Sequence, residues 1–254
     1  MQTCRSPWLP LPMRSGAAAA ALTAACAIGS GAQAQPFRGD GLSSDSAVAV
    51  IVRVPRPWYA PRFVVLGKMR DTIPQYRSLP GLAFKAYSFA QADGHYGGVY
   101  LWKDLASARA WFSPAWFARV EQERGAPAEA RFFEVLAQVD NTAGGTPADP
   151  DSMSVATLSL APLPAGADKS QWARQAQATA AELRQVPGLL RRCIVAADQG
   201  RVGHISLWRN EASAREWFNL AKGGPGAGAS VEWFDTPILL PGALAENPPR
   251  VRGL

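Results

Sequence analysis

The 254-residue chain carries a formal net charge of +6, and its 26 Lys and Arg residues are scattered without a run of five or more. This mild and dispersed positive charge does not indicate a nucleic-acid-binding protein. Three cysteines and two histidines argue against a disulfide framework, a His-rich metal centre or a c-type haem attachment, whereas 48% hydrophobic residues suffice for one large or two small cores.

The first 34 residues have the features of a signal peptide. Arg5 and Arg14 precede an uncharged apolar run from Ala17 to Gly29, and Ala32-Gln33-Ala34 forms a small-x-small cleavage site before Gln35. The apolar run, about 13 residues, is shorter than the roughly 20 residues that a membrane-spanning helix needs. We therefore expect export to the periplasm or beyond, a mature chain that starts at Gln35, and no membrane span.

Cysteine usage follows from that cleavage. It would remove Cys4 and Cys26 and leave Cys193 alone, so the mature chain cannot form an internal disulfide. Cys193 is expected to be a buried, small apolar residue. A lipoprotein signal, with Cys26 as the lipidated residue, is the alternative to cleavage after Ala34.

Residues 46–141 are predicted to form the first folded half. An apolar stripe from Leu66 to Tyr76 recurs at helical spacing, and Pro74 is expected to kink or end that helix. Strands are predicted at 47–54, 82–90, 97–102 and 131–139, and two further helices begin after Asp104 and Ser113. The order is β-α-β-β-α-β, a ferredoxin-like arrangement.

Residues 152–240 are predicted to repeat this order after a Gly- and Pro-containing linker at 142–151. Strands are expected at 154–160, 189–196, 201–208 and 231–240, with helices at 168–185 and 210–220. The helix that opens with Pro114 in the first half is replaced by the glycine-rich segment 222–226 in the second. Residues 241–254 are expected to be a flexible tail.

The two halves also echo each other residue by residue. LPGL at 79–82 returns as VPGL at 186–189, a displacement of 107 residues (186 minus 79), and VYLWKDLASARAWF at 99–112 returns as ISLWRNEASAREWF at 205–218. Solenoid repeats recur at roughly 20 to 50 residues, so this longer period indicates a repeated domain. The predicted fold class is α+β, with two tandem ferredoxin-like halves whose sheets cover each other's apolar faces in one intrachain barrel. We expect a monomer.

The first half resembles the YdhR-like monooxygenase family of the dimeric α/β-barrel superfamily, over roughly residues 63–141. The resemblance rests on LPGL at 79–82, FKAY at 84–87, GGVYLW at 97–102, ASA at 106–108 and FFEV at 132–135. In that superfamily two ferredoxin-like subunits pair their sheets, which implies an intrachain pseudo-dimer here. The second half has Arg192-Cys193-Ile194 in place of the Lys-Ala-Tyr pattern.

The resemblance implies oxygenation of a small aromatic or lipophilic compound without a metal or cofactor, in which a deprotonated phenol or quinol itself passes an electron to dioxygen. That chemistry needs a base or cation near the oxyanion and walls that exclude water. Lys85 and Tyr87 alternate on one face of a predicted strand, so they are the candidate catalytic pair, Lys85 holding the anion and Tyr87 donating a hydrogen bond. Tyr100 and Trp116 are the candidate substrate-binding residues.

Other interpretations remain open at this stage. Lys85 could reach solvent at a strand rim with Tyr87 in the core, and the whole chain could be a non-catalytic periplasmic small-molecule-binding or structural barrel. Haem binding finds little support in two histidines, since His95 is expected in an exposed turn and His204 at the core or its rim.

Overall fold

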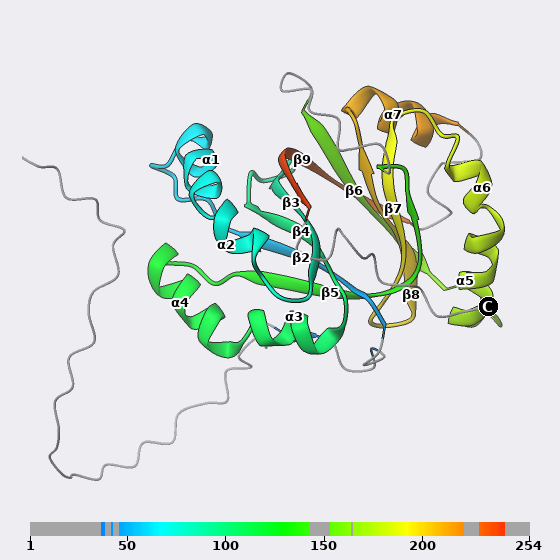
Figure 1. Cartoon of the computed structure of the whole chain (residues 1–254), viewed down its shortest axis with the longest axis horizontal. Coiled ribbons are helices and arrows are strands. Elements are labelled where there is room, and N and C mark those ends of the chain that lie inside the picture. The colour runs from blue at the N-terminus through cyan, green and yellow to red at the C-terminus, as the bar shows by residue number, and fades with distance from the viewer. Residues whose placement is uncertain are drawn as a thin grey trace, which may run out of the picture. The chain divides into compact units, whose positions relative to one another are not determined.

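The computed structural model describes residues 37–38, 42, 46–142, 153–163, 165–220 and 229–241, and within them eight antiparallel strands close into a barrel (Figure 1). All of these residues belong to one compact unit, residues 35–254. The predicted signal peptide, Cys26 included, lies outside the described residues, as do nearly all of the predicted linker and tail. Among the described helices, none is both long and apolar enough to cross a bilayer.

The first set of elements has the predicted β-α-β-β-α-β order. It comprises β2 (Val48–Val54), α1 (Arg62–Asp71), α2 (Ile73–Arg77), β3 (Leu82–Ala90), β4 (Tyr96–Trp102), α3 (Leu105–Trp111), α4 (Pro114–Arg124) and β5 (Glu129–Asp140). A two-residue strand, β1 (Phe37–Arg38), pairs in parallel with β5 and was not predicted.

The second set follows the same order. It comprises β6 (Ser154–Pro162), α5 (Lys169–Ala178), α6 (Ala180–Leu183), β7 (Leu189–Ala197), β8 (Arg201–Trp208), α7 (Glu211–Asn219) and β9 (Ser230–Pro241). The strand positions predicted from the sequence are therefore confirmed to within a few residues.

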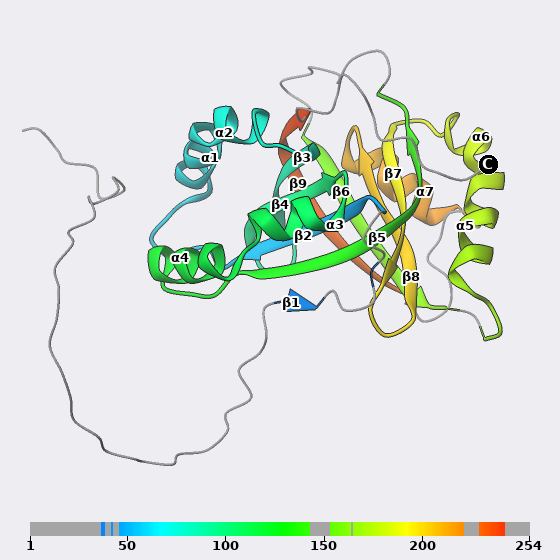
Figure 2. The same cartoon turned by 60° about the horizontal axis from the view of Figure 1, so that its bottom comes forward.

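Two seams join the sets into one barrel. The strand order is β5-β2-β4-β3 in the first sheet and β9-β6-β8-β7 in the second, with β3 paired to β9 and β5 paired to β7. Both pairings are antiparallel, so the barrel closes within a single chain. Helices α1–α4 cover the first sheet and α5–α7 the second, on opposite sides of the barrel (Figures 1 and 2).

Strand periodicity divides the apolar residues into an inner and an outer layer, because successive side chains point to opposite faces. On β2, Ala49 and Ile51 face the barrel interior, whereas Val48 and Val50 face the helices of the first set. The outer layer under α1–α4 is large and rich in aromatic rings. The buried apolar cluster under the helices of the second set is smaller among the described residues, with Val139, Leu183, Leu189, Trp208 and Ala214 as its members.

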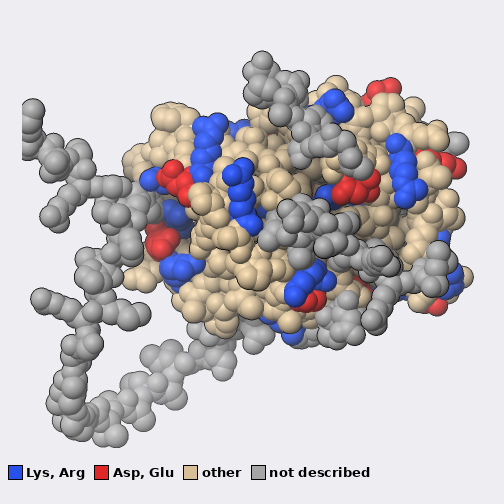
Figure 3. Space-filling view, in the orientation of Figure 1, with Lys and Arg blue, Asp and Glu red and all other residues tan. Residues whose placement is uncertain are grey.

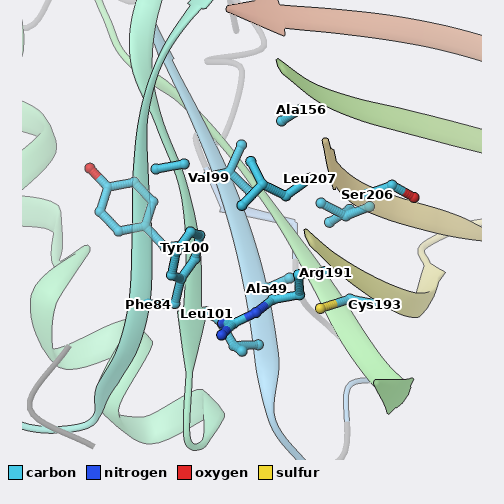
Figure 4. Close-up of a pocket in the computed structure, with 12 residues that line it drawn as sticks. Ala49, Phe84, Val99, Tyr100, Leu101, Ala156, Arg191, Cys193, Ser206 and Leu207 are labelled. Carbon is cyan, nitrogen blue, oxygen red and sulfur yellow. The ribbon is translucent and has the colours of Figure 1, made fainter. Parts of the chain in front are cut away.

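The barrel interior is a packed core. Toward one end, Arg131 makes a bidentate ion pair with Glu232, at 2.7 and 2.8 Å. A narrow cavity lies elsewhere in the barrel interior. Its empty space is about 370 Å³ when open solvent is included, and about 20 Å³ of this space can hold the centre of a water molecule. Tyr100 and Ser206 border this cavity, but their side chains point out of the barrel on opposite sides (Figure 4). The space suits about one water molecule and is too small for an aromatic substrate.

Both long helices after the first strand of a set break at a threonine. Thr72 separates α1 from α2, and its hydroxyl donates to the Met69 carbonyl at 2.7 Å; Thr179 separates α5 from α6, and its hydroxyl donates to the Ala176 carbonyl at 3.0 Å. Such side-chain bonds to a carbonyl of the preceding turn compete with the helix ladder. The first break therefore lies two residues before Pro74, which occupies the first turn of α2, where proline is tolerated.

The repeated Pro-Gly-Leu turn has a steric reason. Gly81 and Gly188 have φ of +81° and +74°, in the left-handed region that glycine adopts most easily. A Cβ at either position would also overlap a serine side chain, Ser107 of α3 or Ser213 of α7. Those serines are held in place because Asp104 and Asn210 cap their helices through the serine backbone N–H groups.

Candidate functional site

Lys85 lies beneath the helices of the first set. Its side chain projects from β3 on the outer face of the barrel, and its backbone is opposite Tyr100 in the β3–β4 pairing. Only 2% of its surface is exposed. The alternative in which Lys85 reaches solvent at a strand rim is therefore wrong.

Three tyrosine rings surround the Lys85 amine. Its Nζ lies 3.1 Å from the ring centroid of Tyr76, 3.7 Å from that of Tyr87 and 4.8 Å from that of Tyr100. We call these three residues around Lys85 the tyrosine box. Tyr87 and Tyr100 come from β3 and β4, and Tyr76 comes from α2, which the break at Thr72 positions over the sheet. The box unites three of the chain's five tyrosines.

The described part of the chain supplies no anion to the Lys85 amine. Among the described residues, neither a carboxylate nor a hydrogen-bond acceptor contacts Nζ. Burial lowers the pKa of Lys85 well below its usual value, because water no longer solvates the ammonium form. The environment therefore favours a neutral amine, which has a free lone pair and can act as a base.

The box hydroxyls stay protonated. Thr72 uses its single hydroxyl hydrogen on the Met69 carbonyl, so the 2.8 Å contact between Tyr87 and Thr72 has Tyr87 as donor. Burial raises the pKa of Tyr87 to about 12. Burial likewise raises the pKa of Tyr100 well above its usual value. The box is thus uncharged when Lys85 is neutral.

Trp116 lies one ring away from the box. Its ring centroid is 5.1 Å from that of Phe112, and Phe112 is 5.2 Å from Tyr100. Among the described residues Trp116 contacts the aromatic layer and not Lys85 itself. The structure therefore brings Lys85, Tyr87 and Tyr100 together as expected, and a role for Trp116 in substrate binding stays a prediction.

Sequence reasoning did not assign Tyr76 and Thr72 to the site. The helical stripe of the sequence predicts that Tyr76 lies in the core, but it does not indicate which residues Tyr76 covers. Its ring is 5.9 Å from Tyr87 and 5.4 Å from Trp111, so it forms the lid of the box. The sequence signal for the position of Tyr76 is Thr72, two residues before Pro74, because this threonine ends the first helix early.

The second set does not repeat the box. Arg192 is opposite Ser206 in the β7–β8 pairing, as Lys85 is opposite Tyr100, and Ile194 follows where Tyr87 would be. Cys193 is buried inside the barrel, as predicted, and burial raises its pKa to about 11, so it is an unreactive thiol.

Neither histidine is part of the tyrosine box. His95 is in the β3–β4 turn, with Nδ1 2.6 Å from Asp93, and His204 lies on β8 against Trp172. Within the described residues, no three His, Cys, Asp or Glu side chains gather as metal ligands would.

The fold and the site define an α+β protein with a closed eight-stranded antiparallel barrel and a buried, unpaired lysine under the first helix layer. Solved structures of similar fold include an anthrone oxidase-like protein, at 10% identity and a TM-score of 0.53, with 83% of this chain and 97% of that chain covered. A candidate monooxygenase from Lactobacillus acidophilus has 10% identity and a TM-score of 0.54, over 77% and 96% of the two chains. Another candidate monooxygenase, from Fusobacterium nucleatum, has 10% identity and a TM-score of 0.57, over 77% and 94%.

Such low identity shows a shared fold and no more. No family model matches the chain. The search of curated proteins found no match either. Membership of the YdhR-like family therefore stays a prediction.

Proposed function

We propose that the protein is a cofactor-independent monooxygenase of the YdhR-like type, in which Lys85 takes the proton of a small phenol or quinol. The observation that carries this proposal is the amine of Lys85, which is buried, lacks an anion and is enclosed by three aromatic rings. An enzyme that makes a phenolate needs a base of lowered pKa in a site without water, and this arrangement meets both conditions.

Proton transfer would create an ion pair where none existed. The Lys85 lone pair accepts the phenol proton, the O–H bond breaks, and an ammonium remains beside the phenolate. Charges form side by side in surroundings of low polarity, where their attraction is strong, and the tyrosine faces stabilise the ammonium. This revises the role expected from the sequence: Lys85 is first a base and then the cation that holds the anion.

The electrons come from the substrate. A deprotonated phenol or quinol passes one electron to dioxygen, and the two radicals then combine. If a ring CH₂ group becomes C=O, one oxygen atom enters the product and the other leaves as water, so no external reductant is required. Tyr100 supplies a hydroxyl donor for the oxygenated intermediate, and Tyr87 supplies a second one when its bond to Thr72 is broken.

Entry to the box requires motion. Lys85 is 2% exposed, and Tyr76 covers it from α2, so a substrate can reach Nζ only when the α1–α2 segment moves away. Among the described residues, the polar links between this segment and strands β3 and β4 include the bond from Tyr87 to Thr72 and a side-chain hydrogen bond between Tyr76 and Tyr100. Closure after binding would exclude water from the phenolate.

The proposal extends to origin and location. The shared order of elements in both sets supports a tandem duplication with a degenerate second copy. The apolar run and Ala32-Gln33-Ala34 support export to the periplasm or beyond; N-terminal sequencing of the exported protein should start at Gln35, and a lipid on Cys26 would contradict this.

A non-catalytic binding or structural barrel is the second candidate. It is favoured by the closed state of the box, since the tyrosine rings themselves fill the space next to Nζ. Under this interpretation ligands bind or the lysine stays buried, but oxygen is not consumed.

Lys85→Met tests the proposal because methionine retains most of the apolar stem and removes the amine. With a panel of quinols and anthrone-type phenols, we expect oxygen uptake by the wild type and a loss of about 100-fold or more in the variant. Lys68→Met, which removes an exposed lysine of α1, should retain the wild-type rate. Equal oxygen uptake by wild type and Lys85→Met would refute the role of Lys85, whereas binding without uptake would favour the non-catalytic candidate.

A further inference from the structure

A second buried cation lies on the other side of the barrel. Arg192 projects from β7 on the outer face, under the helices of the second set, and only 8% of its surface is exposed. Its Nε is buried without a hydrogen-bond partner, and among the described residues no carboxylate pairs with its guanidinium. The adjacent Arg191 points to the other face and pairs with Asp140 at 2.5 Å. The two neighbours thus differ, because Arg191 has an anion and Arg192 receives none from the described residues.

Arg192 cannot escape its charge as Lys85 can. Burial lowers the pKa of Arg192 only to about 10, so the guanidinium remains a cation at neutral pH. A buried charge without a partner destabilises a fold, and structures normally provide one. The position therefore calls for an anion that the described residues do not supply.

The surroundings favour an aromatic anion. The Arg192 Cζ lies 5.5 Å from the ring centroid of Trp217, and the ring of Trp172 lies 5.7 Å from that of His204 on the neighbouring strand. The indole N–H groups of Trp172 and Trp217 are also buried without acceptors. Burial, with help from the Arg192 charge, lowers the pKa of His204 to about 3, so this ring is neutral. One cation, unpaired N–H donors and aromatic walls thus occupy the same layer.

This layer is not sealed by its helix. None of the residues of α5 is buried, whereas α1 buries Val65 and Met69 in the first set and α4 buries Phe117 and Val120. Trp172 and Trp217 are only partly buried, although they face the sheet. Among the described residues, the helices over the strands that carry Arg192 and His204 therefore bury fewer side chains than the helices over the first sheet do.

We propose that the layer between β7–β8 and helices α5 and α7 binds the carboxylate of a small aromatic acid. Arg192 holds the carboxylate through its planar fork, and the indole rings of Trp172 and Trp217 flank the aromatic part of the ligand. The site is separate from the tyrosine box and does not depend on the function proposed for Lys85.

Benzoate is the probe, and neutral benzamide is its control of equal shape. Titration of the full chain, followed by tryptophan fluorescence and calorimetry, should show that benzoate binds and benzamide binds much less tightly. Arg192→Met should weaken benzoate binding by about tenfold to one hundredfold, because a charge-assisted bond is lost. Arg192→Lys, which keeps the charge and loses the fork, should fall between. Arg209→Met removes an exposed arginine next to β8 and should bind as the wild type does.

Thermal unfolding separates a binding role from a structural one. Without ligand, Arg192→Met should unfold at the wild-type temperature or above it, because an unpaired buried charge has been removed. Benzoate should raise the midpoint of the wild type and leave that of Arg192→Met unchanged. A strongly destabilised Arg192→Met protein would show that the arginine is already paired and would overturn the inference.

Two further outcomes would also overturn it. Benzoate binding that survives Arg192→Met and is lost in Lys85→Met would place the anion in the tyrosine box. Benzoate binding that appears only after Asp149, Asp151 and Glu246 are replaced by amides would show that a carboxylate of the chain itself, outside the described residues, occupies the position.

Discussion

Lys85 and Arg192 occupy the same place in their strand pairs, and the chemistry of each side chain decides what burial does to it. Each lies three residues after a leucine that pairs with a tryptophan, Trp102 in one set and Trp208 in the other. The amine can release its proton and become a base, whereas the guanidinium must find an anion. Under the two proposals above, one fold position would serve proton transfer in the first set and anion binding in the second.

The pH dependence of the unfolding free energy tests the burial of His204. Its pKa is about 3 in the folded protein and near 6.5 when unfolded, so between these values the unfolded chain binds more protons. Stability should therefore fall as pH decreases from 6.5 to 3, with a contribution on the order of 4 kcal/mol. Urea unfolding at a series of pH values should show a shallower acid slope for His204→Phe than for the wild type. Equal acid slopes for the wild type and His204→Phe would mean that His204 is accessible to protons in the folded state.

At the scale of the element, strands were easier to predict than helix ends. The strands 82–90 and 201–208 match β3 and β8, since runs of apolar and β-branched residues between turn signals leave few alternatives. The break expected at Pro74 lies two residues earlier, at Thr72, and the break at Thr179 is not predicted, because a threonine hydroxyl that bonds back to its own helix leaves the apolar spacing intact. Lys85 and Tyr87 could be placed on one face from strand periodicity, but Tyr76 could not be assigned to them, because only the packing of α2 brings it there.

Two glycine substitutions, one in a strand and one in a helix, test how tightly the backbone is packed at each position. A Cβ at Gly97 would overlap the Val52 carbonyl oxygen on the paired strand, and backbone cannot move aside as a side chain can. Gly97→Ala should therefore cost about 3 kcal/mol or more of unfolding free energy. Gly67 lies in α1 with no atom within 4 Å of an added Cβ, so Gly67→Ala should stabilise by about 0.5 to 1 kcal/mol. Chemical denaturation measures both, and equal effects of the two substitutions would contradict the packing argument.

At the scale of the molecule, the inner layer belongs to neither set alone. Phe84 and Phe133 from the first set meet Leu158 and Phe234 from the second in one interior cluster. Lys169 of α5 also reaches back to Glu134 on β5, at 3.1 Å. On the face shown in Figure 3, Lys and Arg are dispersed among Asp and Glu, without a block of one sign that would indicate a nucleic-acid surface. Because residues of both sets share this interior cluster, the apolar inner faces of the two sheets cover each other.

This mutual cover predicts a monomer that cannot be divided. Light scattering after size exclusion should give the mass of one mature chain, because the β3–β9 and β5–β7 seams leave neither sheet with an open face. Residues 35–150 and 151–254, expressed separately, should each aggregate, since each exposes one apolar sheet face. Coexpressed, they should form a soluble pair, because the seams are backbone pairings that need no covalent link. A soluble single half, or a full-length dimer that dissociates only on unfolding, would show that the sheets find other partners and that closure within one chain does not determine the assembly.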